Sequence, residues 1–209
     1  MKKLAFLLLT VLLFSFNCAY SEKNSSKETI IKDCKNKCID LNDDLDFCKR
    51  ICEKEILNPR WKFLGFSGNG TALFYDTESL SSFQDIIEVW AKIIFSEGDK
   101  QKIVKFFKKV TKEVIQELED KELEKELELE IKKSEENIKK TDTSLALLRF
   151  NCSKKTRLLL EIVNYDTDGV MIGRVTLKDK KGLLLKTSII PDTLEETLFK
   201  EVCELKNKK

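Results

Sequence analysis

The chain has 209 residues, with 38 basic and 36 acidic side chains, seven cysteines and no histidine. Without histidine there is no imidazole for a Ser-His-Asp triad, for general base catalysis or for metal ligation. The formal net charge is only +2, and charges of both signs are mixed along the chain, so composition gives no reason to expect nucleic acid as a partner.

The first residues have the order of an export signal. Lys2 and Lys3 precede an almost unbroken apolar run over residues 4–16, and small residues at 19 and 21 offer a cleavage site. The run is shorter than the about 20 residues that cross a bilayer as a helix. We predict a signal peptide at 1–21, and a mature chain that is periplasmic or lies at the outer membrane or cell surface. A buried N-terminal helix is the alternative, and it leaves this order unexplained.

Cys18 follows the apolar run and offers a second processing route, in which it is acylated and tethers the protein to a membrane. Phe16 and Asn17 are larger than the residues that usually precede a lipidated cysteine. We expect membrane contact only through such an anchor. On either route an even set of cysteines remains, and in an oxidising compartment such a set usually forms disulfides. Its members are Cys34, Cys38, Cys48, Cys52, Cys152 and Cys203.

Residues 22–57 are predicted to form a flexible leader at 22–29 and then a cysteine-rich helical hairpin. Cysteines four apart lie on one face of each helix. Residues that face each other in an antiparallel hairpin have a constant index sum, which favours Cys34–Cys52 and Cys38–Cys48. Each bridge is worth about 3 kcal/mol to a unit with so small a core. A four-cysteine zinc site is the alternative, although such sites usually have tighter spacing.

Residues 58–209 are predicted to form an α+β domain. Strands are expected at 61–65, 71–75 and 86–95, with a turn at 68–70 and a loop at 76–80. A helical insertion follows at about 98–143. Its first half has an apolar stripe and is expected to pack. Its second half, 120–140, is mostly Glu and Lys, which favours a solvated helix, with a coiled-coil partner as the alternative.

The last third predicts strands at 144–152, 156–165, 170–178 and 183–190, and then a helix that runs to Cys203 and is capped by Asp192 or Thr193. A bridge between the two remaining cysteines, Cys152 and Cys203, would fasten that helix to the sheet. The predicted fold class is therefore α+β: an antiparallel sheet packed with a C-terminal helix, a long helical insertion and an N-terminal disulfide-linked α-hairpin.

A series of short motifs resembles the surface-adhesin protein E family of exported bacterial proteins. They lie at 61–65, 69–71, 75–80, 89–92, 150–152 and 190–193, with Tyr165, Gly169, Glu195, Val202 and Cys203. The resemblance implies an antiparallel sheet with a C-terminal helix packed on it, a Cys152–Cys203 pair, and an adhesive role towards matrix proteins such as vitronectin and laminin. Leu185 stands where relatives have a Trp, and the cysteine hairpin and helical insertion are additions to the pattern.

No catalytic, cofactor or metal site is predicted. Residues 65–69 resemble a nucleophile elbow only in part, because Asn69 replaces the final Gly, and a turn is favoured. Residues 166–169 lack the remaining ligands of a calcium loop. Trp61, Trp90 and the aromatic pair at 74–75 suit a sheet core better than a binding platform. We therefore expect a non-enzymatic, exported protein-binding module of the cell envelope, with a structural component acting through the helical insertion as the alternative.

Overall fold

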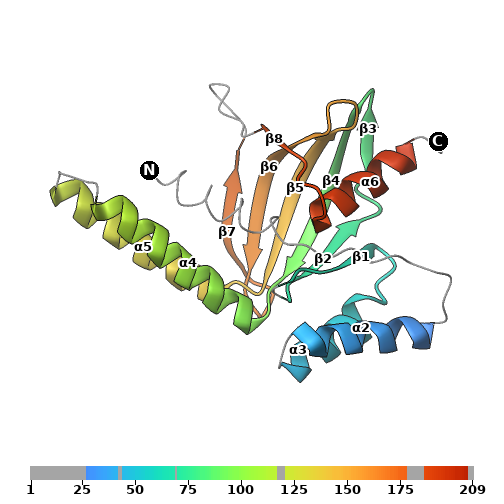
Figure 1. Cartoon of the computed structure of the whole chain (residues 1–209), viewed down its shortest axis with the longest axis horizontal. Helices are drawn as coiled ribbons and strands as arrows, with labels where there is room; N and C mark the ends of the chain where they lie inside the picture. Colours follow the sequence, from blue (N-terminus) through green and yellow to red (C-terminus); the bar gives the residue numbers. More distant parts are fainter. Residues whose placement is uncertain (1–26, 42–43, 69, 117–120, 178–185, 207–209) are drawn as a thin grey trace.

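The computed structural model describes residues 27–41, 44–68, 70–116, 121–177 and 186–206. At its centre is an antiparallel sheet of eight strands, with the spatial order β1-β2-β4-β5-β6-β7, in which β3 pairs with β4 and β8 with β6 (Figure 1). The strands are β1 (Trp61–Phe66), β2 (Ala72–Asp76), β3 (Ser81–Phe83), β4 (Ile86–Ile94), β5 (Thr143–Asn151), β6 (Thr156–Tyr165), β7 (Met171–Thr176) and β8 (Lys186–Ser188).

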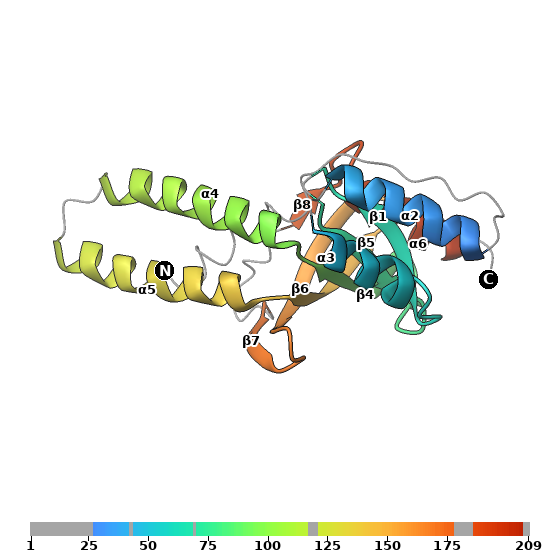
Figure 2. The same ribbon diagram turned by 90° about the horizontal axis from the view of Figure 1, so that it is seen from below.

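Helices surround this sheet in three groups. The cysteine hairpin consists of α2 (Lys27–Leu41), α3 (Leu45–Lys49) and the π-helical segment η1 (Arg50–Glu55). Helices α4 (Glu97–Gln116) and α5 (Lys121–Lys140) are inserted between β4 and β5, and α6 (Leu194–Lys206) is the last element. Figure 2 shows that α6 and the cysteine hairpin lie near the sheet, whereas α4 and α5 extend away from it side by side.

Helix α6 covers one face of the sheet. Its apolar residues Leu194, Leu198 and Val202 join one buried cluster with alternate residues of the central strands, among them Val89 and Leu148. The side chain of Thr193 caps the helix, because its Oγ1 accepts a hydrogen bond from the backbone N–H of Glu196 (3.2 Å). The disulfide Cys152–Cys203 ties the end of this helix to the end of β5.

The cysteine hairpin covers the opposite face at β1 and β2. Phe66, Phe74 and Ile94 point from the sheet into a second buried cluster, which Phe47 and Ile51 enter from the hairpin. The backbone leaves regular register between Phe63 and Gly65, where Gly65 has a φ of 146°. This bulge accompanies the placement of Phe63 and Phe66 on the same face, three residues apart, with ring centroids separated by 5.1 Å.

The predicted fold class is confirmed in all its parts, including the two bridges of the hairpin. The strand expected at 86–95 corresponds to β4, and that at 156–165 to β6. The short strand β3 was not predicted, since Ser81 and Ser82 give no strand pattern. The strand expected at 183–190 is represented by β8, and its first residues lie outside the described part of the chain.

The helical insertion differs from its prediction. We expected one long helix with a solvated second half, but α5 returns alongside α4. Val104 on α4 and Ile138 on α5 are each 8 % exposed, and Lys108 and Glu135 form an ion pair of 3.1 Å between the two helices. The sparse apolar residues in the second half are sufficient because its partner is the first half of the same insertion. We call this pair of helices the arm.

The arm is an enlarged β-hairpin loop. Ile94 at the end of β4 is paired in register with Thr143 at the start of β5, and the N–H of Phe95 donates to the carbonyl of Asp142 (3.0 Å). The chain therefore leaves the sheet and returns to it at adjacent points.

The predicted signal peptide and Cys18 lie outside the described residues. Among the described helices, none combines the length and the apolar character that a membrane span requires.

Candidate protein-binding surface

The cysteine hairpin is fixed internally by its two bridges. Cys34–Cys52 and Cys38–Cys48 have Cα separations of 5.7 and 5.5 Å, and all four residues are buried. The bridges are concentric, as the constant index sum predicted. The carboxylate of Asp44 caps α3 by accepting from the N–H of Phe47 (2.9 Å). The start of α3 is thus capped close to the bridge Cys38–Cys48.

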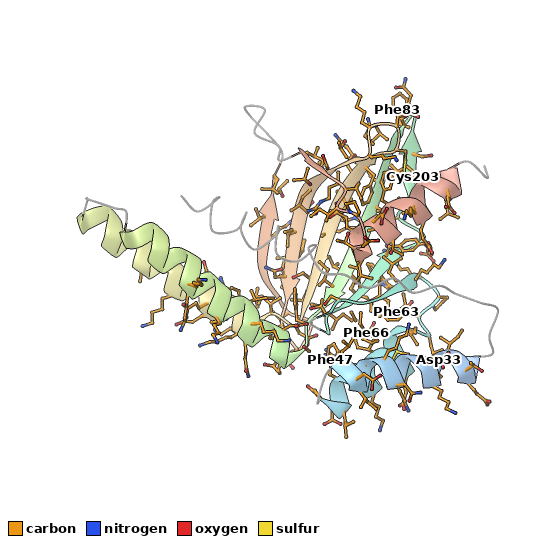
Figure 3. The ribbon with its side chains drawn as sticks, viewed as in Figure 1. Asp33, Phe47, Phe63, Phe66, Phe83 and Cys203 are labelled. Atoms are coloured by element: carbon orange, nitrogen blue, oxygen red, sulfur yellow. A yellow bond between two sulfur atoms is a disulfide. The ribbon has the colours of Figure 1, made fainter. Side chains whose placement is uncertain are left out.

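Ion pairs and apolar contacts dock the hairpin on the sheet. Arg50 lies 3.0 Å from both carboxylate oxygens of Asp142, and Lys92 Nζ lies 2.7 Å from Glu55 Oε2. Lys92 is also 4.6 Å from the ring centroid of Trp61, so its charge has an aromatic neighbour as well as an acidic one. Figure 3 shows Phe47, Phe63 and Phe66 where the hairpin meets β1, whereas Asp33 lies further along α2 and is exposed.

The tip of this fixed hairpin exposes large aliphatic side chains. We call Ile39, Leu41 and Leu45 the hairpin tip; they are 46, 38 and 65 % exposed. Single exposed aliphatic residues are common on soluble proteins. All three lie within seven positions, on an element that two disulfides hold in place; among the described residues, only Val170 and Met171, 58 and 55 % exposed, are closer together in the sequence. Such a group is typical of a protein contact.

A shallow pocket of about 210 Å³ lies beside the hairpin tip. Phe47 and Phe95 form its apolar part, and Arg50 contributes the positive charge that pairs with Asp142. The remaining lining groups are the carboxylates of Asp44, Asp46 and Glu97. Lys100 pairs with Glu97, and the carboxylates of Asp44 and Asp46 add acidic charge that suits the cationic side chain of a partner, next to an apolar contact at the tip.

One buried titratable group lies at the start of α4. Asp99 is 1 % exposed and accepts a hydrogen bond from the Thr71 hydroxyl, while its Oδ1 has no hydrogen-bond partner among the described groups. Burial raises the pKa of Asp99, against the hydrogen bond from Thr71 and the charge of Lys102. In the described part of the chain there is no group of three or more Cys, Asp or Glu residues placed to hold a metal ion.

A second buried pair lies beneath α6. Arg157 Nε is 2.6 Å from Glu195 Oε1 and donates its hydrogen bond to Thr187 Oγ1 (3.1 Å). Neither carboxylate oxygen of Glu195 accepts a hydrogen bond from the described residues, and its side chain is fully buried. Burial raises the pKa of Glu195 to about 7, against the positive charge of Arg157. The pair lies inside the core, so it is a structural feature and not an accessible site.

The motifs that resembled parts of catalytic or calcium sites are turns. Ser67 is buried, and its hydroxyl accepts from the N–H of Thr71 (3.1 Å). The carboxylate of Asp166 accepts from the N–H groups of Asp168 and Val170 (3.0 and 2.8 Å), which closes a turn around Gly169.

The aromatic residues divide between core and margin. Phe74 and Tyr75 are 0 and 1 % exposed and belong to the cores on opposite faces of the sheet, as expected. Trp61 and Trp90 are only half-buried. Trp61 packs against the cluster beneath the hairpin. The core prediction is therefore right for the first pair and only partly right for the tryptophans.

These features define a disulfide-bonded α+β protein with a projecting arm. No known family model and no curated protein matches the chain. Among solved structures, crystal form II of Haemophilus influenzae protein E is similar to it with a TM-score of 0.34 and 12 % identity, over 64 % of this chain and 80 % of that chain. A similarity this low is too weak to carry any conclusion about function.

Sequence reasoning missed the hairpin tip. Leu41 fell in the expected break between the two helices, Leu45 was assigned to the apolar pattern of the second helix, and Ile39 was not singled out. A signal was present only for Ile39, which directly follows the inward-facing Cys38, because adjacent residues of a helix point in different directions.

Proposed function

We propose that this protein is an exported, non-enzymatic protein-binding module of the bacterial cell envelope, and that its contact surface is the hairpin tip with the adjoining acidic pocket. The observation that carries the proposal is the exposure of Ile39, Leu41 and Leu45 on an element fixed by two disulfides. A rigid apolar surface loses little conformational entropy when a partner covers it.

Export is supported by the disulfides. Six cysteines of the described chain form three bridges, which is typical of proteins that mature in an oxidising compartment. An adhesive role towards matrix proteins is the finer form of this proposal, and it rests on the sequence motifs.

The test is retention of the purified protein on immobilised vitronectin, on laminin and on envelope extract. A double variant, I39S/L45S, should lose retention, because it removes apolar contact without touching the cysteines or the docking residues. F83S is the matched control: Phe83 is 73 % exposed and lies on β3, far from the hairpin (Figure 3). Equal retention of I39S/L45S and wild type would contradict the assignment of the surface, and failure of folded wild type on all three supports would contradict the function.

A structural role through the arm is the second candidate, favoured by the way α4 and α5 extend from the sheet (Figures 1 and 2). Here the arm would associate with another copy. A variant in which residues 101–137 are replaced by a short Gly-Ser linker tests this, because the sheet enters and leaves the arm at adjacent points. Sedimentation should give an oligomer for the wild type and a monomer for the variant. Identical monomer masses would remove this candidate.

A further inference from the structure

Folding brings two lysine-rich segments together at the base of the arm. Residues 101–109 of α4 contain four lysines and no acidic residue, and residues 132–140 of α5 contain four lysines and two glutamates. The two segments are more than 20 residues apart in the sequence, but both lie where the arm joins the sheet (Figure 2). The ion pair between Lys108 and Glu135 (3.1 Å) fixes them beside each other.

These lysines are on the surface. All eight are exposed: Lys102, Lys105, Lys108, Lys109, Lys132, Lys133, Lys139 and Lys140. We call them the lysine collar. Together with the two glutamates the two segments carry a formal charge of +6. The chain after residue 21 has equal numbers of basic and acidic residues, 36 of each, so this local charge is concealed in the total.

Their spacing extends the charge along both helices. Lys102, Lys105 and Lys109 are separated by three and four positions and form one stripe on α4. With a rise of 1.5 Å per residue this stripe is about 10 Å long. On α5, Lys132 and Lys139 lie seven positions apart, as do Lys133 and Lys140, and each pair repeats on one side of the helix. The charge is therefore distributed over two neighbouring helices and is not confined to a single track.

We propose that the lysine collar docks on a bilayer surface rich in anionic phospholipid. The breadth of the charge suits an extended surface better than one linear polymer. The two segments contain no arginine, and lysine attracts phosphate as a point charge without the fixed two-pronged geometry of a guanidinium. Such charges suit fluid headgroups, which offer phosphates in no set arrangement. This contact would add to any lipid anchor at Cys18 and does not depend on the hairpin tip.

The test is co-sedimentation of the full chain with vesicles of phosphatidylcholine that contain 30 % phosphatidylglycerol, at 20 to 150 mM NaCl (about 20 to 8 Å of electrostatic screening length). Pure phosphatidylcholine vesicles measure any contribution of the apolar N-terminal residues. We expect binding to the anionic vesicles that weakens as salt increases. Each lysine near such a surface contributes a factor of about 5, so loss of four should weaken binding by several hundredfold.

Two variants with the same change in net charge separate the collar from overall charge. One carries K102Q, K105Q, K132Q and K139Q. Its control carries K32Q, K49Q, K54Q and K154Q, which change exposed lysines outside the arm. We expect the first to lose binding and the second to stay within a few-fold of wild type. Equal losses in both variants, equal binding of wild type to both kinds of vesicle, or binding to immobilised heparin without binding to vesicles would each overturn the proposal.

Discussion

The buried pair beneath α6 predicts an unequal response to the loss of either partner. Glu195 is fully buried and Arg157 is 6 % exposed, so neither charge is hydrated in the folded protein. In E195Q the guanidinium remains buried and charged at every accessible pH, since arginine does not lose its proton in proteins. The amide that E195Q introduces cannot ionise, so this variant lacks the stability that the wild type loses as Glu195 gives up its proton near pH 7. We therefore expect the loss of E195Q relative to wild type to be smaller at pH 8 than at pH 5.

R157M behaves differently, because a carboxylic acid can escape its buried charge by taking up a proton. Burial already raises the pKa of Glu195 to about 7 beside Arg157. Without the arginine this pKa rises further. At pH 5 Glu195 is then neutral and R157M is expected to lose about 1–2 kcal/mol, the range of a buried polar group without a full hydrogen-bond set. At pH 8 the loss should be larger by about 1 kcal/mol, since each pH unit above the wild-type pKa of about 7, up to the new pKa, adds about 1.4 kcal/mol.

Glu195 also makes the free energy of unfolding of the wild type depend on pH. A carboxyl whose pKa is higher in the folded than in the unfolded chain binds its proton more tightly when folded, so its contribution is fully present below the unfolded value of 4.5 and is lost as pH rises to about 7. Over that window the loss from Glu195 is about 3 kcal/mol.

The assay is urea unfolding of wild type, E195Q, R157M and the double variant E195Q/R157M at pH 5 and pH 8. The double variant removes both charges and should recover most of the loss that E195Q suffers alone. Losses for E195Q and R157M that are equal at both pH values would refute the reasoning, because they would mean that Glu195 does not change its protonation state in the folded protein.

Three further predictions concern the arm, the hairpin bridges and the ion pair of Arg60 with Asp76. Replacing residues 101–137 with a Gly-Ser linker should change the free energy of unfolding by less than about 2 kcal/mol, because the strands at both ends stay paired. Urea unfolding measures this change. A failure to fold would show that the arm belongs to the core. The double variant C38S/C48S should lose about 3 kcal/mol of unfolding free energy, the value for a disulfide that closes a loop of this length. Limited proteolysis should then cut within the hairpin first. Unchanged protease resistance would contradict this. Burial alone would raise the pKa of Asp76, but hydrogen bonds and the charge of Arg60 outweigh it and hold this pKa below its usual value. The contribution of Asp76 to the stability of the fold is therefore present above pH 4 and is lost as pH falls further. In thermal unfolding, R60A should weaken this acid sensitivity.

Local patterns predicted the hairpin bridges because the geometry of a helix leaves few choices. Cysteines four apart on each of two short helices permit one concentric pairing, and the structure has it. Strands β4 and β6 were found for a similar reason: continuous runs of β-branched and large apolar residues suit a strand buried between neighbours. In these segments local propensity and tertiary environment agree.

The prediction was wrong where the partner of an element lies at a distance in the chain. Residues 120–140 are polar enough to suggest a solvated helix, and nothing within them shows that α4 lies alongside. The same limit explains why the lysine collar was missed: mixed charge along the sequence concealed a grouping that exists only when α5 folds back on α4. A residue count gives net charge, whereas a partner responds to the charges within about 10 Å of its own surface.

The two proposed surfaces lie on different helices and approach each other only at the acidic pocket, which Glu97 of α4 and Asp142 also line. The hairpin tip is carried by α2 and α3, whereas the lysine collar is carried by α4 and α5, and the sheet connects the two groups through the buried contacts of Arg50 and Lys92. One molecule could therefore bind a protein at the tip while its arm contacts a membrane. If both surfaces act together, addition of anionic vesicles should leave retention of the protein by its partner unchanged. A competition between vesicles and the protein partner would instead show that the acidic pocket and the collar serve the same ligand.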